Sequence, residues 1–132
     1  MKCLQGASAV EQVLGENERL KLHGMIVWEP VLASDWAPPI TGTLGRIYDT
    51  RVAQFYDKGL LVSALAQPEL LKDPTPIVGN EDLVKGKIVW DYVAVYTRGA
   101  AWHGKDMPAP SFKAAPVVEA EKQLRAFLAT LQ

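Results

Sequence analysis

The stretch that decides the fold spans residues 87–101 and reads KIVWDYVAVYTRGAA. From Ile88 to Tyr96 nearly every residue is β-branched or aromatic, apart from Asp91 and one alanine. A run of this length and composition is typical of a strand buried on both faces. Gly99 permits a sharp reversal, so we expect residues 100–102 to return beside the strand. The sequence therefore predicts a hairpin at the centre of a sheet, with the other elements packed on it.

The N-terminal part predicts a helix followed closely by a strand. Residues 4–14 carry apolar side chains at spacings of three and four, which form one helical face, and Gly15 is a suitable end. Residues 20–29 indicate a strand whose buried part is Met25–Trp28 and which Pro30 ends. A helix and a strand in this order suggest an α/β layer.

The middle of the chain predicts shorter elements. Thr41 is a candidate cap for a helical turn over residues 42–47. Residues 51–56 indicate a short strand. Residues 59–66 indicate a helix that Pro68 would stop, although the same run also fits another strand.

The C-terminal part predicts a loop and then a helix. Residues 103–116 are rich in proline and indicate a loop, and Pro116 fits the first turn of a helix. The helix is expected from one apolar stripe, which consists of Val117, Ala120, Leu124, Phe127, Leu128 and Leu131.

Composition bounds the class of protein. The chain has 132 residues, 48% of them hydrophobic, and a net charge of -1 with scattered basic residues, so we expect one domain and neither nucleic acid nor membrane as a partner. No apolar run reaches the roughly 18 residues of a membrane-spanning helix. No secretory signal is visible, so we expect a cytoplasmic protein. Cys3 is the only cysteine, which excludes an internal disulfide, and no ligand spacing points to a metal or another cofactor.

Three stretches and the order of elements carry a resemblance to a known family. The stretches are VWEPVL at 27–32, RVAQFYD at 51–57 and VWDYVAVY at 89–96. They resemble a group of bacterial thioredoxin-like proteins of poorly defined function. The resemblance implies a single α/β domain over residues 1–132, with a sheet of about four strands flanked by helices. An α+β arrangement is the alternative.

The departures from that family bear on function. Thioredoxins begin with a strand inside the sheet and carry a CxxC motif, whereas here no strand precedes the first helix and Gly6 occupies the position of a second cysteine after Cys3. The cis-proline of the family should precede the central strand, where Gly86 and Lys87 stand instead. We therefore expect a sheet that closes differently, is completed by another subunit, or belongs to a truncated module. Dithiol chemistry is excluded within this chain.

Cys3 is the candidate catalytic residue. It would lie near a helix N-terminus, whose dipole stabilises a thiolate, and Lys2 adds positive charge. A monothiol role, with a mixed disulfide to a small thiol or a protein, is one hypothesis. The alternative, which the position near the N-terminus favours, is a cysteine without a functional role at a frayed chain end.

Asp91 and nearby aromatic residues form a candidate ligand site. Asp91 interrupts a strand meant for burial, so it would either face a pocket as a base or ligand anchor, or have a structural role. The structural role would be an ion pair, with Arg51 or Arg98 as suggested partners, or a hydrogen bond to the backbone. The structural alternative is favoured. The aromatic candidates for lining a pocket are Trp28, Trp36, Trp90 and Tyr92, and plain core packing is their alternative.

The sequence thus supports three hypotheses. The first is a non-catalytic thioredoxin-like binding or interaction module that forms a homodimer or binds a protein partner, because an incomplete sheet leaves an edge to be covered. The second is a monothiol redox or thiol-transfer protein that uses Cys3. The third is a binder of a small molecule, or an enzyme, built around Asp91 and the aromatic residues.

Overall fold

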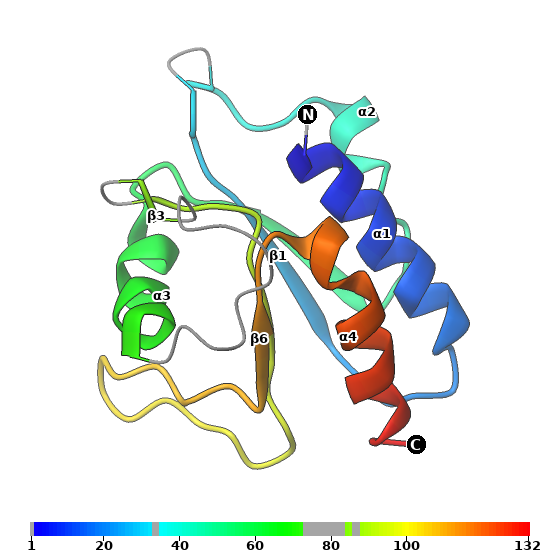
Figure 1. Ribbon diagram of the computed structural model, residues 1–132. Helices are drawn as coiled ribbons and strands as arrows, with labels where there is room; N and C mark the ends of the chain where they lie inside the picture. The colour runs from blue at the N-terminus through cyan, green and yellow to red at the C-terminus, as the bar shows by residue number, and fades with distance from the viewer. Residues whose placement is uncertain (1, 33–34, 73–83, 86–87) are drawn as a thin grey trace.

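The computed structural model describes residues 2–32, 35–72, 84–85 and 88–132 (Figure 1). Helices and strands are mixed along the chain, which confirms the predicted α/β class. In order, the elements are α1 (Lys2–Glu16), β1 (Gly24–Trp28), α2 (Thr41–Leu44), β2 (Val52–Tyr56), α3 (Leu61–Lys72), β3 (Val84–Lys85), β4 (Ile88–Val89), β5 (Val93–Val95), β6 (Phe112–Ala114) and α4 (Val117–Ala129).

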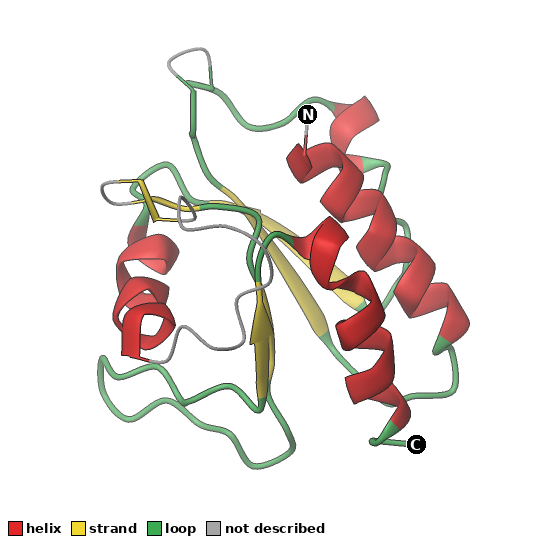
Figure 2. Ribbon diagram, in the orientation of Figure 1, coloured by secondary structure: helices red, strands yellow, loops and turns green. Residues whose placement is uncertain are grey.

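Helices α1 and α4 pack against each other and form one layer (Figure 2). The apolar periodicity of both sequences explains the contact, because each helix buries one stripe. One buried cluster of the core consists of Val13 from α1 and Leu124 and Leu128 from α4. Helix α3 lies on the other side of the strands and contacts β4 (Figure 2).

The final helix agrees with its prediction except at its end, because Leu131 lies beyond α4 and is 38% exposed. Pro116 directly precedes α4 as its N-cap residue. The side chains that α4 buries are Val117, Ala120, Leu124 and Leu128. Phe127 stacks on Phe112 of β6, with 5.3 Å between ring centroids, so the apolar stripe connects the helical layer to the strands.

The strands of the described residues form separate pairs rather than one four-stranded sheet. β1 and β2 are parallel, with Gly24 opposite Val52 and Trp28 opposite Tyr56. β3 and β4 are antiparallel, and so are β5 and β6. The strands expected within residues 20–29 and 51–56 are confirmed as the shorter strands β1 and β2. The expected burial of Met25 is wrong, since its side chain is 76% exposed.

The predicted central strand is broken. Ile88 and Val89 belong to β4, whereas Val93–Val95 form β5, and between them Asp91 has a φ of 47°. That left-handed conformation cannot continue a strand. The returning strand is also misplaced in the prediction, since β5 pairs with residues 112–114 and not with residues 100–102. A long excursion, and not a tight turn at Gly99, therefore connects the two strands.

Two predictions about helix ends are wrong. Pro68 lies inside α3, which continues to Lys72. Thr41 is the first residue of α2 and Ile40 is the N-cap residue, without a capping side-chain hydrogen bond. Both predictions relied on the local helix propensity of single residues, which tertiary packing can override. Residues 73–83, part of the predicted long connection, lie outside the described residues.

Candidate functional site

Cys3 lies in the first turn of α1, as expected, and its side chain is half-buried. Burial raises the pKa of the thiol, and the negative charges of Asp91 and Asp35 raise it further. A hydrogen bond to the backbone at Cys3 acts in the opposite direction. The net effect is the reverse of the stabilised thiolate expected from the helix terminus, because buried surroundings and carboxylates both disfavour a second negative charge.

Asp91 lies against the first turns of α1. A Cβ built on Gly6 would fall 2.5 Å from Asp91 Oδ1, so only a glycine allows the carboxylate to approach the helix this closely. The backbone carbonyl of Asp91 also accepts a hydrogen bond of 3.0 Å from the N–H of Val117, at the start of α4. Asp91 thus joins the N-terminal ends of two helices, where a negative charge is favourable.

The ion pair expected between Asp91 and Arg51 is absent, because Arg51 binds Asp49. The Arg51 side chain contacts Asp49 Oδ2 at 2.5 Å. Arg98, the other suggested partner, is an exposed residue. The structure therefore places Cys3 and Asp91 in one neighbourhood, and assigns Asp91 a backbone role at the start of α4.

The four aromatic candidates have different surroundings. The indole Nε1 of Trp28 donates a hydrogen bond of 3.0 Å to Gln54, whereas Trp36 is 78% exposed. Trp90 and Tyr92 are half-buried on either side of Asp91. Burial raises the pKa of the Tyr92 hydroxyl above its ordinary value. Trp28 is thus a packed residue of the β1–β2 pair, and Trp36 is a surface residue.

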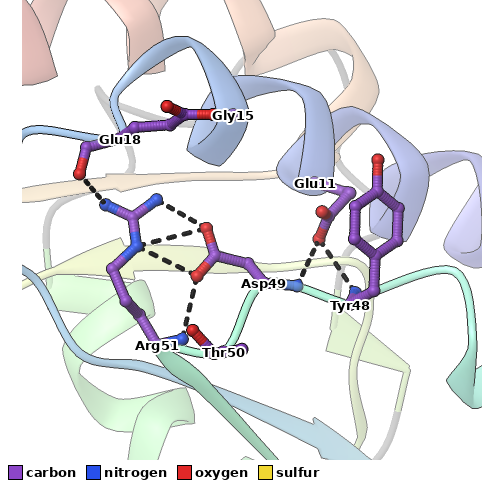
Figure 3. Close-up of a pocket in the computed structure, with 7 residues that line it drawn as sticks. All are labelled: Glu11, Gly15, Glu18, Tyr48, Asp49, Thr50 and Arg51. Carbon is purple, nitrogen blue, oxygen red and sulfur yellow. Dashed lines mark hydrogen bonds and ion pairs between the residues drawn. The ribbon is translucent and has the colours of Figure 1, made fainter.

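A cavity of about 400 Å³ lies at a place that the sequence did not suggest (Figure 3). None of the predicted site residues lines it. Its lining consists of Glu11, Gly15, Glu18, Tyr48, Asp49, Thr50 and Arg51. In the sequence, only the short Asp-Thr-Arg turn before β2 could have indicated this cavity, and such turns are common at the start of strands.

Arg51, which lines the cavity, also caps the C-terminal end of α1. Its guanidinium donates hydrogen bonds to the carbonyl oxygens of Leu14 at 2.8 Å, Asn17 at 2.9 Å and Leu20 at 3.0 Å. These carbonyls belong to the last turn of the helix and the chain beyond it, and those of Leu14 and Asn17 also accept hydrogen bonds of 3.0 Å from the backbone N–H groups of Asn17 and Leu20. Hydrogen bonds from Arg51 hold the pKa of the Asp49 carboxyl low, at about 2. The cationic group is therefore engaged in structural bonds.

Glu11 holds the opposite wall of the cavity. Its carboxylate accepts hydrogen bonds from the backbone N–H groups of Tyr48 at 3.1 Å and Asp49 at 3.2 Å (Figure 3). Glu11 is only 8% exposed. A buried carboxylate that accepts backbone hydrogen bonds fixes the chain that enters β2, which is a structural role.

A second polar network connects β1, α3 and β4. The carboxylate of Glu29, just after β1, accepts hydrogen bonds from both the backbone N–H and the hydroxyl of Ser63. The Ser63 oxygen accepts a further hydrogen bond of 2.9 Å from the N–H of Val89. Because the serine donates to Glu29 and accepts from Val89, the network ties three elements together.

The described residues contain neither a group of three potential metal ligands nor a helix that could span a membrane. Among the described residues, no three His, Cys, Asp or Glu side chains are grouped so as to hold a metal ion. None of the helices in that part of the chain has both the length and the apolar character to cross a membrane. Comparison with protein-family models, curated proteins and solved structures gives no match.

Proposed function

We propose that this chain is a non-catalytic, thioredoxin-like interaction module that associates as a homodimer. The observation that carries the proposal is an uncovered apolar face on the β1–β2 pair. Met25 lies opposite Ala53 in the register, and Val27 lies opposite Phe55, so these four side chains share one face.

That face is exposed to an unusual degree. Met25 is 76% exposed and Phe55 is 51% exposed, and Ala53 is exposed as well. Parallel strands are normally covered on both faces, because their side chains are apolar on both. Contiguous exposed apolar surface of this kind marks interaction sites. A second copy that presents the same face would cover it in an isologous contact.

Sedimentation velocity at micromolar concentration tests the proposal. The wild-type chain should sediment as a dimer, and Phe55→Lys should sediment as a monomer because the lysine places a charge in the interface. Trp102→Lys is the matched control, since Trp102 is 52% exposed but lies in the segment between β5 and β6. A wild-type monomer at all concentrations, with circular dichroism of a folded protein, would refute the homodimer.

A second candidate function is a monothiol transfer by Cys3, whose half-buried thiol lies in the first turn of α1. In this reaction the Cys3 thiol loses its proton to water, and the thiolate attacks one sulfur of a disulfide RS–SR′. A Cys3–S–SR bond forms, the S–S bond breaks, and R′S⁻ leaves. The raised pKa of the thiol keeps the thiolate fraction small at neutral pH, so the exchange should be slow.

Incubation with oxidised glutathione tests this candidate. Mass spectrometry should detect a mixed disulfide in the wild-type chain and none in Cys3→Ser. The candidate fails if no adduct forms at neutral pH while the thiol titrates near the ordinary value of about 8.5. The homodimer does not depend on this result, because Cys3 lies outside the β1–β2 face.

A further inference from the structure

Met25 places an exposed sulfur atom on the apolar face of the β1–β2 pair. Its side chain is 76% exposed, and the residue opposite it in the register is Ala53, whose short side chain cannot cover a thioether. Phe55 lies two residues further along β2 on the same face and is 51% exposed. A long side chain and an aromatic one in such a diagonal pair are within reach of each other. The thioether is therefore part of the surface that the proposed homodimer covers.

This face offers no partner for a polar group at Met25. Its other residues are Val27, Ala53 and Phe55, and none of their side chains donates or accepts hydrogen bonds. A second copy that presents the same face contributes the same residues. A polar group at Met25 would thus be buried without a side-chain partner, which is unfavourable.

We propose that Met25 is an oxidation site and that its conversion to the sulfoxide separates the homodimer. This inference rests on the proposed function and adds its regulation. The oxidant is a peroxide, ROOH. The sulfur attacks the terminal oxygen, an S–O bond forms and the O–O bond breaks. Sulfur loses two electrons, and the leaving RO⁻ takes the proton from the transferred oxygen and departs as ROH. The product is a polar side chain in place of an apolar one.

The symmetry of the dimer doubles the effect of the modification. In an isologous contact each residue of the face enters the interface twice, once from each copy. Two sulfoxides would therefore lose water on association. The dimer also covers the thioether, so the oxidant reaches Met25 in the free monomer, and oxidation keeps that monomer apart.

The other sulfur atoms of the described residues are less open to a peroxide. They belong to Cys3 and Met107, which are both partly buried. A thiol reacts as its thiolate, and burial together with Asp91 raises the pKa of Cys3, so little thiolate is present at neutral pH. A thioether has no proton to lose, and its reaction depends on exposure. Exposure therefore favours Met25.

Hydrogen peroxide and sedimentation velocity test the inference. All measurements use the Cys3→Ser background, in which no disulfide can link two copies because Cys3 is the only cysteine. Mass spectrometry of tryptic peptides measures the sulfoxide at Met25. Complete oxidation should raise the dissociation constant of the dimer at least about tenfold. Sulfoxide reductases for both epimers, with dithiothreitol as the reductant, should then restore the dimer.

Three variants assign the effect to Met25. Met25→Leu has a similar volume and cannot be oxidised, so peroxide should leave its own dissociation constant unchanged. Met25→Gln imitates the polar product and should sediment as a monomer without peroxide. Met107→Leu is the matched control and should respond to peroxide as the parent chain does, because Met107 lies between β5 and β6. Loss of the Met25→Leu dimer in peroxide would overturn the assignment.

The dependence of the oxidation rate on protein concentration tests the order of events. Oxidation of Met25 should be roughly fourfold slower at ten times the dissociation constant than at one tenth of it, by mass action. Oxidation of Met107 should not vary with concentration. Equal rates for Met25 at both concentrations would overturn the protection by the dimer.

The outcomes separate this inference from the proposed function. A chain that is dimeric before oxidation and equally dimeric with Met25 fully oxidised overturns the inference and leaves the homodimer. A chain that is monomeric before any peroxide is added refutes the homodimer, and the regulation of the homodimer with it.

Discussion

The carboxylate of Asp91 and the backbone of Gly6 are in such close contact that a Cβ on Gly6 would lie 2.5 Å from Asp91 Oδ1. The same absent Cβ would lie 3.4 Å from Val117 Cβ. Gly6 is the place where α1, the loop before β5 and the start of α4 meet. The contact explains why a glycine stands inside a helix, where it lowers helix propensity.

Gly6→Ala should therefore destabilise the fold, although alanine is the better helix former. Overpacking costs about 1 to 3 kcal/mol, whereas the gain in helix propensity is about 1 kcal/mol. We expect a net loss of about 1 kcal/mol in the free energy of unfolding, measured in urea. Gly15→Ala is the control in the same helix, and it should stabilise the protein because nothing lies within 4 Å of its Cβ position. A stabilised Gly6→Ala would contradict the close contact.

Asp91→Asn should lower the pKa of the Cys3 thiol. The negative charge of Asp91 is the second-largest cause that raises this pKa, after burial, and the amide removes it. The pH dependence of alkylation by iodoacetamide measures the pKa, and alkylation at neutral pH should become faster. Asp106→Asn, at an exposed position, should change neither. An unchanged profile in Asp91→Asn would show that Asp91 does not act on the thiol.

Asp49 should contribute to stability only above acidic pH. Its folded pKa is lowered from the ordinary 3.8 to about 2, so its contribution is present above the unfolded value and is lost as the pH falls through the folded one. Denaturation by urea between pH 4 and pH 2 measures the loss. In Asp49→Asn this part of the decline should disappear, since the amide does not titrate. An identical pH dependence in both proteins would place the loss on other carboxylates.

Arg51→Ala should destabilise the protein more than the loss of its ion pair alone would predict. The guanidinium also donates to the carbonyl oxygens of Leu14 and Asn17 at the end of α1, and these would lose one of their hydrogen bonds and keep the one from the backbone. We expect a loss of about 3 kcal/mol in the free energy of unfolding. Arg46→Ala is the control, because Arg46 is exposed and its guanidinium donates to the hydroxyl of Ser8. Equal losses in the two variants would contradict the role of Arg51 as a helix cap.

Ser63→Ala should loosen the connection between α3 and β4. The substitution removes the acceptor of the Val89 N–H and the hydroxyl that donates to Glu29. A buried group left unsatisfied costs about 1 to 3 kcal/mol, and the Val89 amide should exchange faster. Ser8→Ala, on the exposed face of α1, should cost less than about 0.5 kcal/mol. Slow exchange at Val89 in Ser63→Ala would show that another group satisfies it.

The candidate site was predictable in part. The helix–terminus position of Cys3 and the oddity of Asp91 in an apolar strand are visible in the sequence, and the structure brings the two into one neighbourhood. Arg51, one of the two partners suggested for Asp91, binds Asp49 instead. No spacing rule relates Arg51 to the end of α1, because the two are neighbours only after β2 has packed.

The sequence by itself determined the elements whose signals are local. Periodic apolar positions define α1 and α4, and short β-rich runs define β1 and β2, because each pattern reports which side chains one element can bury. Tertiary structure alone decided three features, which are the break of the predicted central strand at Asp91, the pairing of β5 with residues 112–114 and the continuation of α3 past Pro68. These features depend on contacts between segments far apart in the chain, such as Asp91 with Gly6 and Val117, whose energy no local pattern contains.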